Sequence, residues 1–395
     1  MIQIVMFLVA LLTVVLDIRT YKRLCDSGVG HVWRYSFLGF IVIANLLLWA
    51  GPALMFSPWA MTAQQPLMRL TSLSLTLYIL LTLPRLLLYA LLLTTRRRGA
   101  RWLAGALSAA LLAVLVYGVT VTRTDYRIKP VVLHFDNLPK SFDGYRIAFI
   151  SDIHIGSMCN AEKELEQLSH VVESTRADLL AFGGDLVNLS CEELSPAIVE
   201  RLSRLRGRDG TVAILGNHDT GTYIFDTLST PRHANIERVC EGMRRAGWRT
   251  LRDSTEYLRR GCDSIAITGI DYTEELLLYK HSFDTPQGFD PAPIFEGVEP
   301  SLFNITLSHL PQLWHPLCEG GFSDLTLSGH VHATQIKAEC GKIRLSPAML
   351  MYREWSGLYS APQGSLYITD GIGYVGFYGR FGANPEVTLI ELRCK

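Results

Sequence analysis

The sequence has little charge for its length, and its cysteines form no motif typical of a metal or redox site. Charged residues make up 19% of the 395 residues and hydrophobic residues 49%. This balance excludes a disordered, collagen-like or coiled-coil chain and indicates that part of the chain lies in lipid. The eight cysteines include no Cys-x-x-Cys and no Cys/His zinc pattern, so a thiolate metal site is not expected.

Acidic residues are scarce in the first third of the chain. Residues 1–122 hold ten basic side chains and two acidic ones, a net charge of +8. The remaining 27 basic and 35 acidic side chains give a net charge of −8. A net charge of −8 makes residues 123–395 a poor electrostatic partner for the phosphate backbone of a nucleic acid. No nucleic-acid partner is therefore expected, and a nuclease is disfavoured.

Four apolar stretches precede residue 123. They cover approximately residues 2–16, 32–56, 70–93 and 102–121. The last three are long enough to cross a hydrocarbon core of about 30 Å as helices. The first lacks the basic start and small-residue cleavage site of a signal peptide, which favours an uncleaved span. We expect residues 1–122 to form a four-helix transmembrane bundle, followed by a second domain over residues 123–395.

Basic residues predict how this bundle is oriented. They cluster around the first and third loops, whereas residues 57–68 contain no Lys or Arg. The residues in these clusters are Arg19, Lys22, Arg23 and Arg34, and then Arg96, Arg97, Arg98 and Arg101. The positive-inside rule places those two loops in the cytoplasm and everything after the fourth span outside. A multi-pass protein of a bacterial-type inner or plasma membrane is expected, with its second domain on the exoplasmic side.

Arg85 follows Pro84 inside the third apolar stretch. An intramembrane charge can meet a lipid headgroup or an ion. Alternatively, the side chain extends toward the cytoplasmic arginine cluster, helped by a bend at Pro84. The second interpretation is favoured.

The second domain alternates between predicted strands and helices. Strands are expected at residues 131–133, 145–150, 178–182, 211–215, 264–268, 303–307, 325–327, 365–369 and 387–392. Helices are expected at residues 161–175 and 192–205. Strand–helix–strand units at this spacing predict a largely parallel sheet with helices packed against it, an α/β fold.

Polar residues follow five of these strands directly. They are Asp152 and His154, then Asp185, then Asn217, His218 and Asp219, then His309, and finally His330 and His332. Ligands bind at the carboxyl ends of strands in open α/β sheets, so we expect these side chains to share one rim. Gly184, Gly216 and Gly329 are expected to let the backbone turn sharply beside them.

Carboxylate, amide and imidazole groups together suit divalent Mn, Fe or Zn. Their number exceeds what one tetrahedral zinc needs, which indicates two metal ions that share a carboxylate.

The series Asp152-x-His154, Gly184-Asp185, Gly216-Asn217-His218-Asp219, His309 and Gly329-His330-Val331-His332 resembles the calcineurin-like metallophosphoesterases. All five blocks occur in that family's order, and the resemblance covers roughly residues 126–393. Segments 357–359 and 385–389 are similar to the membrane-linked branch of this family.

This resemblance implies a two-sheet α/β sandwich and a role for each site residue. Asp152, His154 and His332 would hold one metal ion, and Asn217, His309 and His330 the other, with Asp185 bridging the two. His218 would protonate or stabilise the leaving oxygen, and Asp219 would fix the tautomer of His218. A hydroxide bridging the metal ions would then attack phosphorus in line.

Four spans exceed what a tether requires, so the expected substrate is a lipid or lipid-linked phosphoester or pyrophosphate. Two alternatives remain open. One is a phosphodiesterase for soluble nucleotides, and the other is a non-catalytic metal-binding sensor or transport-associated membrane protein. The oligomeric state is not predicted.

Other residues have both an ordinary and a functional interpretation. Segment 345–359 is rich in large apolar groups and is either core or a rim for an acyl chain or the bilayer. Arg353 and Arg380 either contact substrate phosphate or, as favoured, lie on the surface. An extracytoplasmic location would allow disulfides between Cys159 and Cys191 and between Cys262 and Cys340. Histidines outside the blocks are expected to be ordinary surface or packed residues: His31, His134, His170, His233, His281 and His315.

Overall fold

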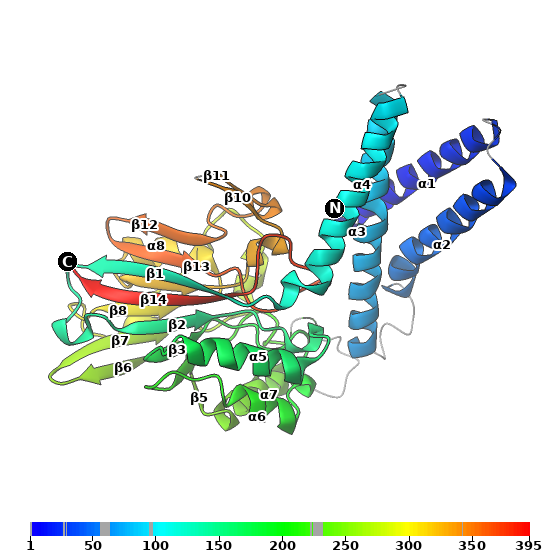
Figure 1. The fold of residues 1–395 in the computed structure, drawn as a ribbon. Coiled ribbons are helices and arrows are strands. Elements are labelled where there is room, and N and C mark those ends of the chain that lie inside the picture. The colour runs from blue at the N-terminus through cyan, green and yellow to red at the C-terminus, as the bar shows by residue number, and fades with distance from the viewer. Residues whose placement is uncertain are drawn as a thin grey trace. The chain divides into compact units, whose positions relative to one another are not determined.

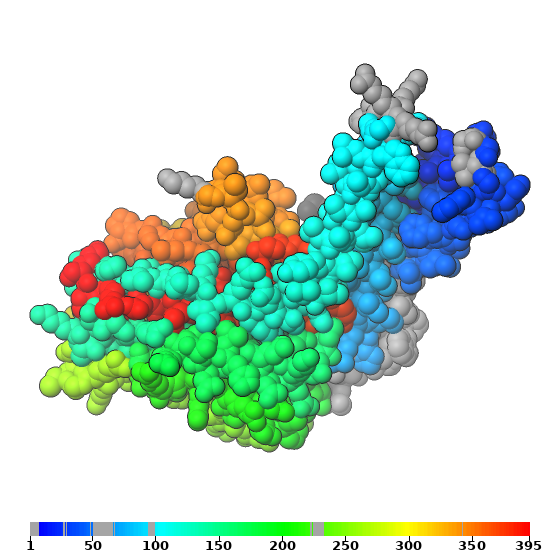
Figure 2. Space-filling model, viewed as in Figure 1, coloured from blue at the N-terminus to red at the C-terminus, as the bar shows by residue number. Residues whose placement is uncertain are grey.

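The structure is a computed structural model that describes residues 2–26, 28, 30–55, 64–94, 98–221, 223, 232–341 and 343–395. The chain divides into two compact units. The helical unit comprises Met1–Val121 with Gly376–Gly379, and the α/β unit comprises Thr122–Val375 with Arg380–Lys395. Figure 1 labels their elements, and Figure 2 shows one face in the same colours. Arg96, Arg97 and most of the predicted loop 57–68 lie outside the described residues.

Four long helices form the helical unit. They are α1 (Ile2–Asp26), α2 (His31–Met55), α3 (Gln64–Thr94) and α4 (Arg98–Thr120). Within the described residues, two segments are long and apolar enough to cross a membrane, Met68–Leu93 and Gly99–Thr124. His31–Leu47 is apolar but shorter. Four helices therefore occur where four were predicted, but length and composition support only two as membrane spans.

Arg85 forms a buried ion pair, which neither sequence interpretation anticipated. Its Nη1 lies 2.8 Å from Oδ2 of Asp17 on α1, and the two residues are 7% and 1% exposed. Asn45 on α2 and Tyr89 on α3 also donate hydrogen bonds to the Asp17 carboxylate. The favoured interpretation, that Arg85 extends toward the arginine cluster, is wrong because a carboxylate 68 residues earlier neutralises its charge inside the unit.

The α/β unit contains two six-stranded sheets, which confirms the prediction of a mixed α/β domain with two sheets. The first has the order β1-β14-β2-β3-β4-β5, and the second β12-β13-β9-β8-β7-β6. Strands β2 to β5 are mutually parallel, as are β7, β8, β9 and β13. The strands are β1 (Arg127–Phe135), β2 (Arg146–Ile150), β3 (Leu179–Phe182), β4 (Thr211–Ala213), β5 (Trp248–Thr250), β6 (Ser254–Arg260), β7 (Asp263–Gly269), β8 (Asn304–Leu307), β9 (Leu325–Ser328), β10 (Ala338–Cys340), β11 (Ile343–Leu345), β12 (Gly357–Ala361), β13 (Gly364–Ile368) and β14 (Glu386–Cys394).

Alternation along β2 explains the layers. Ile147 and Phe149 join a core cluster that contains side chains from both sheets, whereas Ala148 and Ile150 pack with residues from helices on the other face. Successive strand residues point to opposite faces, so a strand buried on both sides is apolar throughout. The helices are α5 (Ala161–Ser174), α6 (Pro196–Leu202), α7 (Arg232–Arg245) and α8 (Trp314–Glu319). Figure 1 shows α5, α6 and α7 together beside the first sheet.

The predicted helix over residues 192–205 is interrupted. A short 3₁₀ helix covers Cys191–Glu193, and α6 begins only at Pro196. Proline disfavours the helical conformation in the residue before it, and Ser195 instead caps α6 by accepting a hydrogen bond from the backbone N–H of Ile198. The break leaves Glu193 free to bind the loop that follows β3.

Candidate metal centre

The predicted ligands lie at strand ends where the backbone is left-handed. Five of them have positive φ, a conformation uncommon outside glycine that concentrates at functional sites. These are Asp152 (59°), His154 (46°), Asp185 (60°), His330 (69°) and His332 (53°). Strands β2 and β3 of one sheet and β9 of the other therefore end in turns that direct these side chains toward one another.

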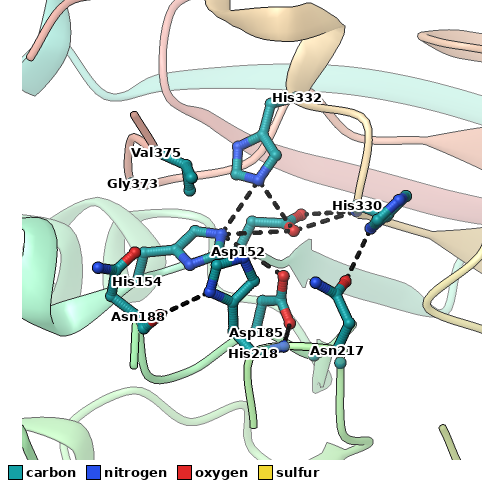
Figure 3. A network of polar contacts seen from close by, with 12 residues as sticks. Asp152, His154, Asp185, Asn188, Asn217, His218, His330, His332, Gly373 and Val375 are labelled. Carbon is teal, nitrogen blue, oxygen red and sulfur yellow. Dashed lines mark hydrogen bonds and ion pairs between the residues drawn. The ribbon is translucent and has the colours of Figure 1, made fainter. Parts of the chain in front are cut away.

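Asp152, His154 and His332 form a first buried group of potential ligands. Nε2 of His332 lies 3.1 Å from Oδ1 of Asp152 and 3.1 Å from Nε2 of His154. Figure 3 shows His332 facing the other two, which come from the opposite sheet. The structure thus brings together the three residues predicted to hold one metal ion.

Asn217, His309 and His330 form the second group. Oδ1 of Asn217 lies 3.1 Å from Nε2 of His309 and 2.9 Å from Nδ1 of His330. Oδ2 of Asp185 lies 3.3 Å from Nε2 of His309 and 3.6 Å from Nε2 of His154. Asp185 therefore lies between the two groups, as a bridging carboxylate would.

The charges of these groups fit two divalent cations. Asp152 and Asp185 are almost fully buried, yet in the described part of the chain neither forms an ion pair with Lys or Arg. Burial raises the pKa of the Asp185 carboxyl, but the imidazoles of His309 and His218 hold that pKa well below its usual range. Burial lowers the pKa of His309, whereas Asp185 raises it to about 9. The positive charge of the imidazoles thus offsets the negative charge of the carboxylates, a role that bound cations would take over.

Backbone geometry shows why glycines flank the ligands. Gly184 has φ of +95°, as expected for a sharp turn. Gly216 and Gly329 instead have no room for a side chain. A Cβ on Gly216 would lie 2.1 Å from Oδ1 of Asp185, and one on Gly329 would lie 2.5 Å from Oδ2 of Asp152. The prediction that Gly216 and Gly329 are glycine because of a sharp turn is therefore wrong. Glycine is needed at these two positions because the side chain of a predicted ligand lies close to the backbone.

His218 lies beside the first group, but Asp219 does not contact its ring. Nδ1 of His218 lies 2.6 Å from the carbonyl oxygen of Asn188, which can orient the ring by accepting a hydrogen bond from Nδ1–H. The Asp219 carboxylate instead accepts hydrogen bonds from backbone N–H groups of Asp185, Leu186, Val187 and Gly216. The expectation that Asp219 fixes the tautomer of His218 is wrong, because a backbone carbonyl occupies that place.

Glu193 was not identified from the sequence. Its carboxylate accepts hydrogen bonds from the backbone N–H groups of Gly156, Asn188, Leu189 and Ser190. It therefore joins the loop after β2 to the loop after β3, including the residue whose carbonyl orients His218. The partners are backbone groups, so only the local Ser-x-x-Glu pattern of a capping box could have indicated this role.

Tyr223 and Lys280 form a second feature that the sequence did not indicate. The Tyr223 hydroxyl accepts hydrogen bonds from Nδ2 of Asn217 at 2.9 Å and from Nζ of Lys280 at 3.1 Å. Its ring centroid lies 4.4 Å from that of His218. Tyr223 thus links the Lys280 ammonium group to a predicted ligand, and the Tyr223 ring lies beside the predicted leaving-group acid.

Arg380 is fully buried, not a surface residue or a substrate contact. Its guanidinium donates to the carbonyl oxygens of Asp370, Gly373 and Ala383, and Nη2 lies 3.5 Å from Nδ1 of His332. Burial lowers the pKa of Arg380 to about 10, against the opposing effect of Asp370. Arg380 therefore stabilises the backbone between Asp370 and Ala383, which lies next to His332. Arg353 is exposed.

The remaining histidines and cysteines lie outside the two groups. His31, His134, His170 and His233 are exposed, as expected. His315 pairs with Glu354 at 3.4 Å. His281 is exposed, but its Nδ1 lies 2.6 Å from the Tyr352 hydroxyl beside the centre. All eight cysteines, which include Cys159, Cys191, Cys262 and Cys340, are free thiols, so the structure contains neither of the disulfides that an extracytoplasmic location would allow.

Segment 345–359 divides between the two interpretations. Ala348, Tyr352 and Trp355 are buried in a core cluster, whereas Leu345, Met349 and Leu350 are 52%, 46% and 76% exposed. Ser346 donates a hydrogen bond of 2.6 Å to the carbonyl of Ala333, next to His332. Figure 2 shows this region, coloured orange, on the surface of the α/β unit. Its outer side is an exposed apolar surface attached to a ligand loop.

Comparisons with known proteins agree on one family. A family model described as calcineurin-like phosphoesterase matches residues 145–334. The chain is 29% identical to a Danio rerio protein named transmembrane protein with metallophosphoesterase domain, over 73% of this chain and 62% of that protein. It is 26% identical to metallophosphoesterase YkuE of Bacillus subtilis, over 76% of this chain and 98% of that protein. It is 30% identical to UDP-2,3-diacylglucosamine pyrophosphatase LpxG of Chlamydia trachomatis, over 65% of this chain and 87% of that protein.

The matched region coincides with the site. It begins one residue before β2 and ends two residues after His332, so it includes all nine predicted site residues. The chain spans less than two thirds of the Danio rerio relative but most of the two bacterial ones. On this evidence the chain belongs to the calcineurin-like phosphoesterase family and is a metal-dependent phosphoester hydrolase.

Proposed function

We propose that this protein is a membrane-anchored dimetal hydrolase that cleaves a phosphoester or pyrophosphate bond in a lipid or lipid-linked substrate. The observation that carries the proposal is the pair of ligand groups that meet at Asp185. Asp152, His154 and His332 would hold one cation and Asn217, His309 and His330 the other, with Asp185 between them. Two bound cations would activate water at neutral pH and neutralise charge on the phosphate.

The chain's own groups would position and protonate the substrate. His218 lies within reach of the first group, with ring centroids of His218 and His154 4.6 Å apart. Because the Asn188 carbonyl accepts a hydrogen bond from Nδ1–H, Nε2 is the atom available to donate a proton to a leaving oxygen. Asp219 would act indirectly, by holding the Asp185 loop through its backbone N–H groups.

The position of Lys280 favours a substrate with a charged leaving group. Cleavage of a pyrophosphate releases a phosphate group, which remains negatively charged after protonation. Cleavage of a simple diester releases an alkoxide, which becomes a neutral alcohol after protonation. The Lys280 ammonium donates to the Tyr223 hydroxyl, which is also bonded to Asn217, so it would pair with the charge of the released phosphate near the ligands. Two relatives from Chlamydia are named pyrophosphatases, which agrees with this preference.

Three features support a lipid substrate. The names of the two Chlamydia relatives include a diacylated sugar nucleotide, UDP-2,3-diacylglucosamine. The helical unit contains two segments able to cross a bilayer. Exposed apolar side chains at Ile343, Leu345 and Leu350 belong to a segment bonded to the loop of His332, where an acyl chain could lie.

The membrane arrangement is also part of the proposal. We infer a transmembrane helical domain over residues 1–122 and a catalytic domain over residues 123–395. The basic residues near the first and third loops favour a cytoplasmic position for those loops and an exoplasmic catalytic domain. Fusion of a reporter active only outside the cytoplasm to Lys395 tests this orientation.

The function is tested with the purified full-length protein in detergent and Mn²⁺. We expect faster hydrolysis of a diacylated diphosphate lipid than of a soluble aryl phosphodiester, and no turnover of either by Asp185→Ala. Equal rates on both substrates would favour the soluble-nucleotide alternative. Hydrolysis of neither, by a protein shown to bind metal, would contradict the enzymatic proposal.

A further inference from the structure

The helical unit contains a cavity that the catalytic proposal does not use. Its volume is about 420 Å³, and α1, α3 and α4 line it. Apolar walls come from leucines of α1 and α3, and polar groups come from Arg19, Thr20, Arg23, Tyr89 and Arg101. The leucines are Leu16, Leu24, Leu92 and Leu93. One side of the space is therefore hydrocarbon-like, and the other carries three guanidinium groups.

These guanidinium groups have almost no acidic partners nearby. Residues 1–122 contain only two carboxylates, Asp17 and Asp26. Asp17 is buried and bound to Arg85, so its charge is already neutralised. In the described residues, no ion pair involves Arg19, Arg23 or Arg101. The cavity consequently keeps an excess of positive charge, which an anion would offset.

The walls of the cavity are held by the buried network described above. Tyr89 lines the cavity and donates its hydroxyl hydrogen bond to Asp17, which also binds Arg85. Thr20, another lining residue, donates to the carbonyl of Leu16 at 2.8 Å. Two of the three helices that line the space, α1 and α3, are thus joined before a ligand enters it, and a fixed site loses less entropy on binding.

The position along the helices indicates the membrane level. Arg23 lies in the last turn of α1, Leu92 and Leu93 lie near the end of α3, and Arg101 lies in the first turn of α4. These are the helix ends that meet the polar surface of a bilayer. Basic pockets between membrane helices at that level are suited to phosphate headgroups of anionic lipids.

We propose that this cavity binds an anionic phospholipid. Its phosphate pairs with Arg19, Arg23 and Arg101, and the upper part of its acyl chains lies against the leucines. Pockets of about 300–1,000 Å³ hold drug-sized ligands, so this space fits a headgroup and the first chain carbons, while the remaining chains extend into the bilayer. The site belongs wholly to the helical unit and does not depend on the proposed catalytic function.

The test compares two charge-matched variants of the full-length protein, delipidated in detergent. Arg23→Gln with Arg101→Gln removes two charges from the cavity. Lys22→Gln with Arg34→Gln removes two charges from positions that do not line it. Native mass spectrometry measures binding of dioleoyl phosphatidylglycerol, with dioleoylglycerol and inorganic phosphate as separate probes. We expect the cavity variant to bind phosphatidylglycerol at least tenfold more weakly than wild type, and the control variant to stay within twofold.

Each result decides the proposal. Equal binding of dioleoylglycerol and phosphatidylglycerol would overturn the role of the phosphate. Inorganic phosphate that competes as well as the lipid would identify a free-anion site and overturn the role of the chains. Circular dichroism and the Tm in detergent report whether each variant is folded, and the single change Arg101→Gln replaces the double variant if the latter is not. Unaltered lipid binding in a folded cavity variant would also refute the site.

Discussion

His218 is the residue whose role is most clearly separable from metal binding. Its ring is oriented by a backbone carbonyl. His218 also lies in a potential ligand group with His154 and Asp185, but removal of its ring leaves the other two groups complete. We predict that His218→Ala retains two metal ions per chain but lowers kcat about 10²–10⁴-fold, the range typical of a general acid. Metal analysis and steady-state kinetics measure both quantities.

A graded set of leaving groups sharpens this prediction. An ester with a more acidic leaving group needs less proton donation, so its rate should fall less in the variant. His170→Ala, which changes an exposed histidine on α5, is the matched control and should behave as wild type. Loss of metal from His218→Ala would instead indicate that the ring is a ligand.

The candidate ligands can be predicted from the sequence because they adjoin strands in compact blocks. In the structure, five of them adopt strained backbone conformations at those strand ends. Prediction from the sequence failed for residues whose partners carry no sequence signal. Asp219 and Arg380 bind backbone N–H or carbonyl groups, which every residue possesses. The charge of Arg85 was visible, but its pairing with Asp17 depends on how α1 packs against α3.

At the level of elements, Glu193 joins the loops after β2 and β3. Burial raises the pKa of its carboxyl, and the four backbone N–H groups act in the opposite direction. Glu193→Gln replaces one acceptor oxygen with a donor that faces N–H groups. We predict a loss of about 1–3 kcal/mol in the free energy of unfolding, and a lower kcat because the Asn188 carbonyl moves. Denaturant unfolding and kinetics test the two effects.

The adjacent residue supplies the control for this change. Glu192 is exposed and forms a surface ion pair with Arg238 at 3.3 Å. Glu192→Gln should change stability by less than about 1 kcal/mol, since surface pairs contribute little. If both variants were equally stable, Glu193 would not join the loops as its contacts indicate.

At the scale of the whole molecule, the two buried carboxylates make the α/β unit dependent on its cations. Removal of metal leaves Asp152 and Asp185 with only imidazoles as ion-pair partners among the residues that the structure describes. We predict that chelation abolishes hydrolysis and lowers the Tm by about 5–10 °C, the effect of about 2.7 kcal/mol for a ligand at 100 times its Kd. Added Mn²⁺ should restore both, as calorimetry can follow. A Tm in Asp185→Ala that still responds to Mn²⁺ as in wild type would contradict the assigned ligand set.

The helical unit depends in the same way on one buried carboxylate. Asp17 on α1 binds Asn45 on α2 as well as Arg85 and Tyr89 on α3, so it connects three helices. Asp17→Asn leaves the Arg85 charge buried without a counter-ion, which typically costs about 3–5 kcal/mol. We predict a lower Tm in detergent for this variant, whereas Asp26→Asn at an exposed position should have no effect.

A double change separates pairing from burial. Replacement of both Asp17 and Arg85 by leucine removes the two charges together, so no isolated charge remains and less stability should be lost than the two single changes predict in sum. The double variant should nevertheless bind phosphatidylglycerol more weakly, because Tyr89 loses the partner that holds it in the cavity wall. Strictly additive effects on Tm would show that the two side chains act independently, despite the 2.8 Å between them.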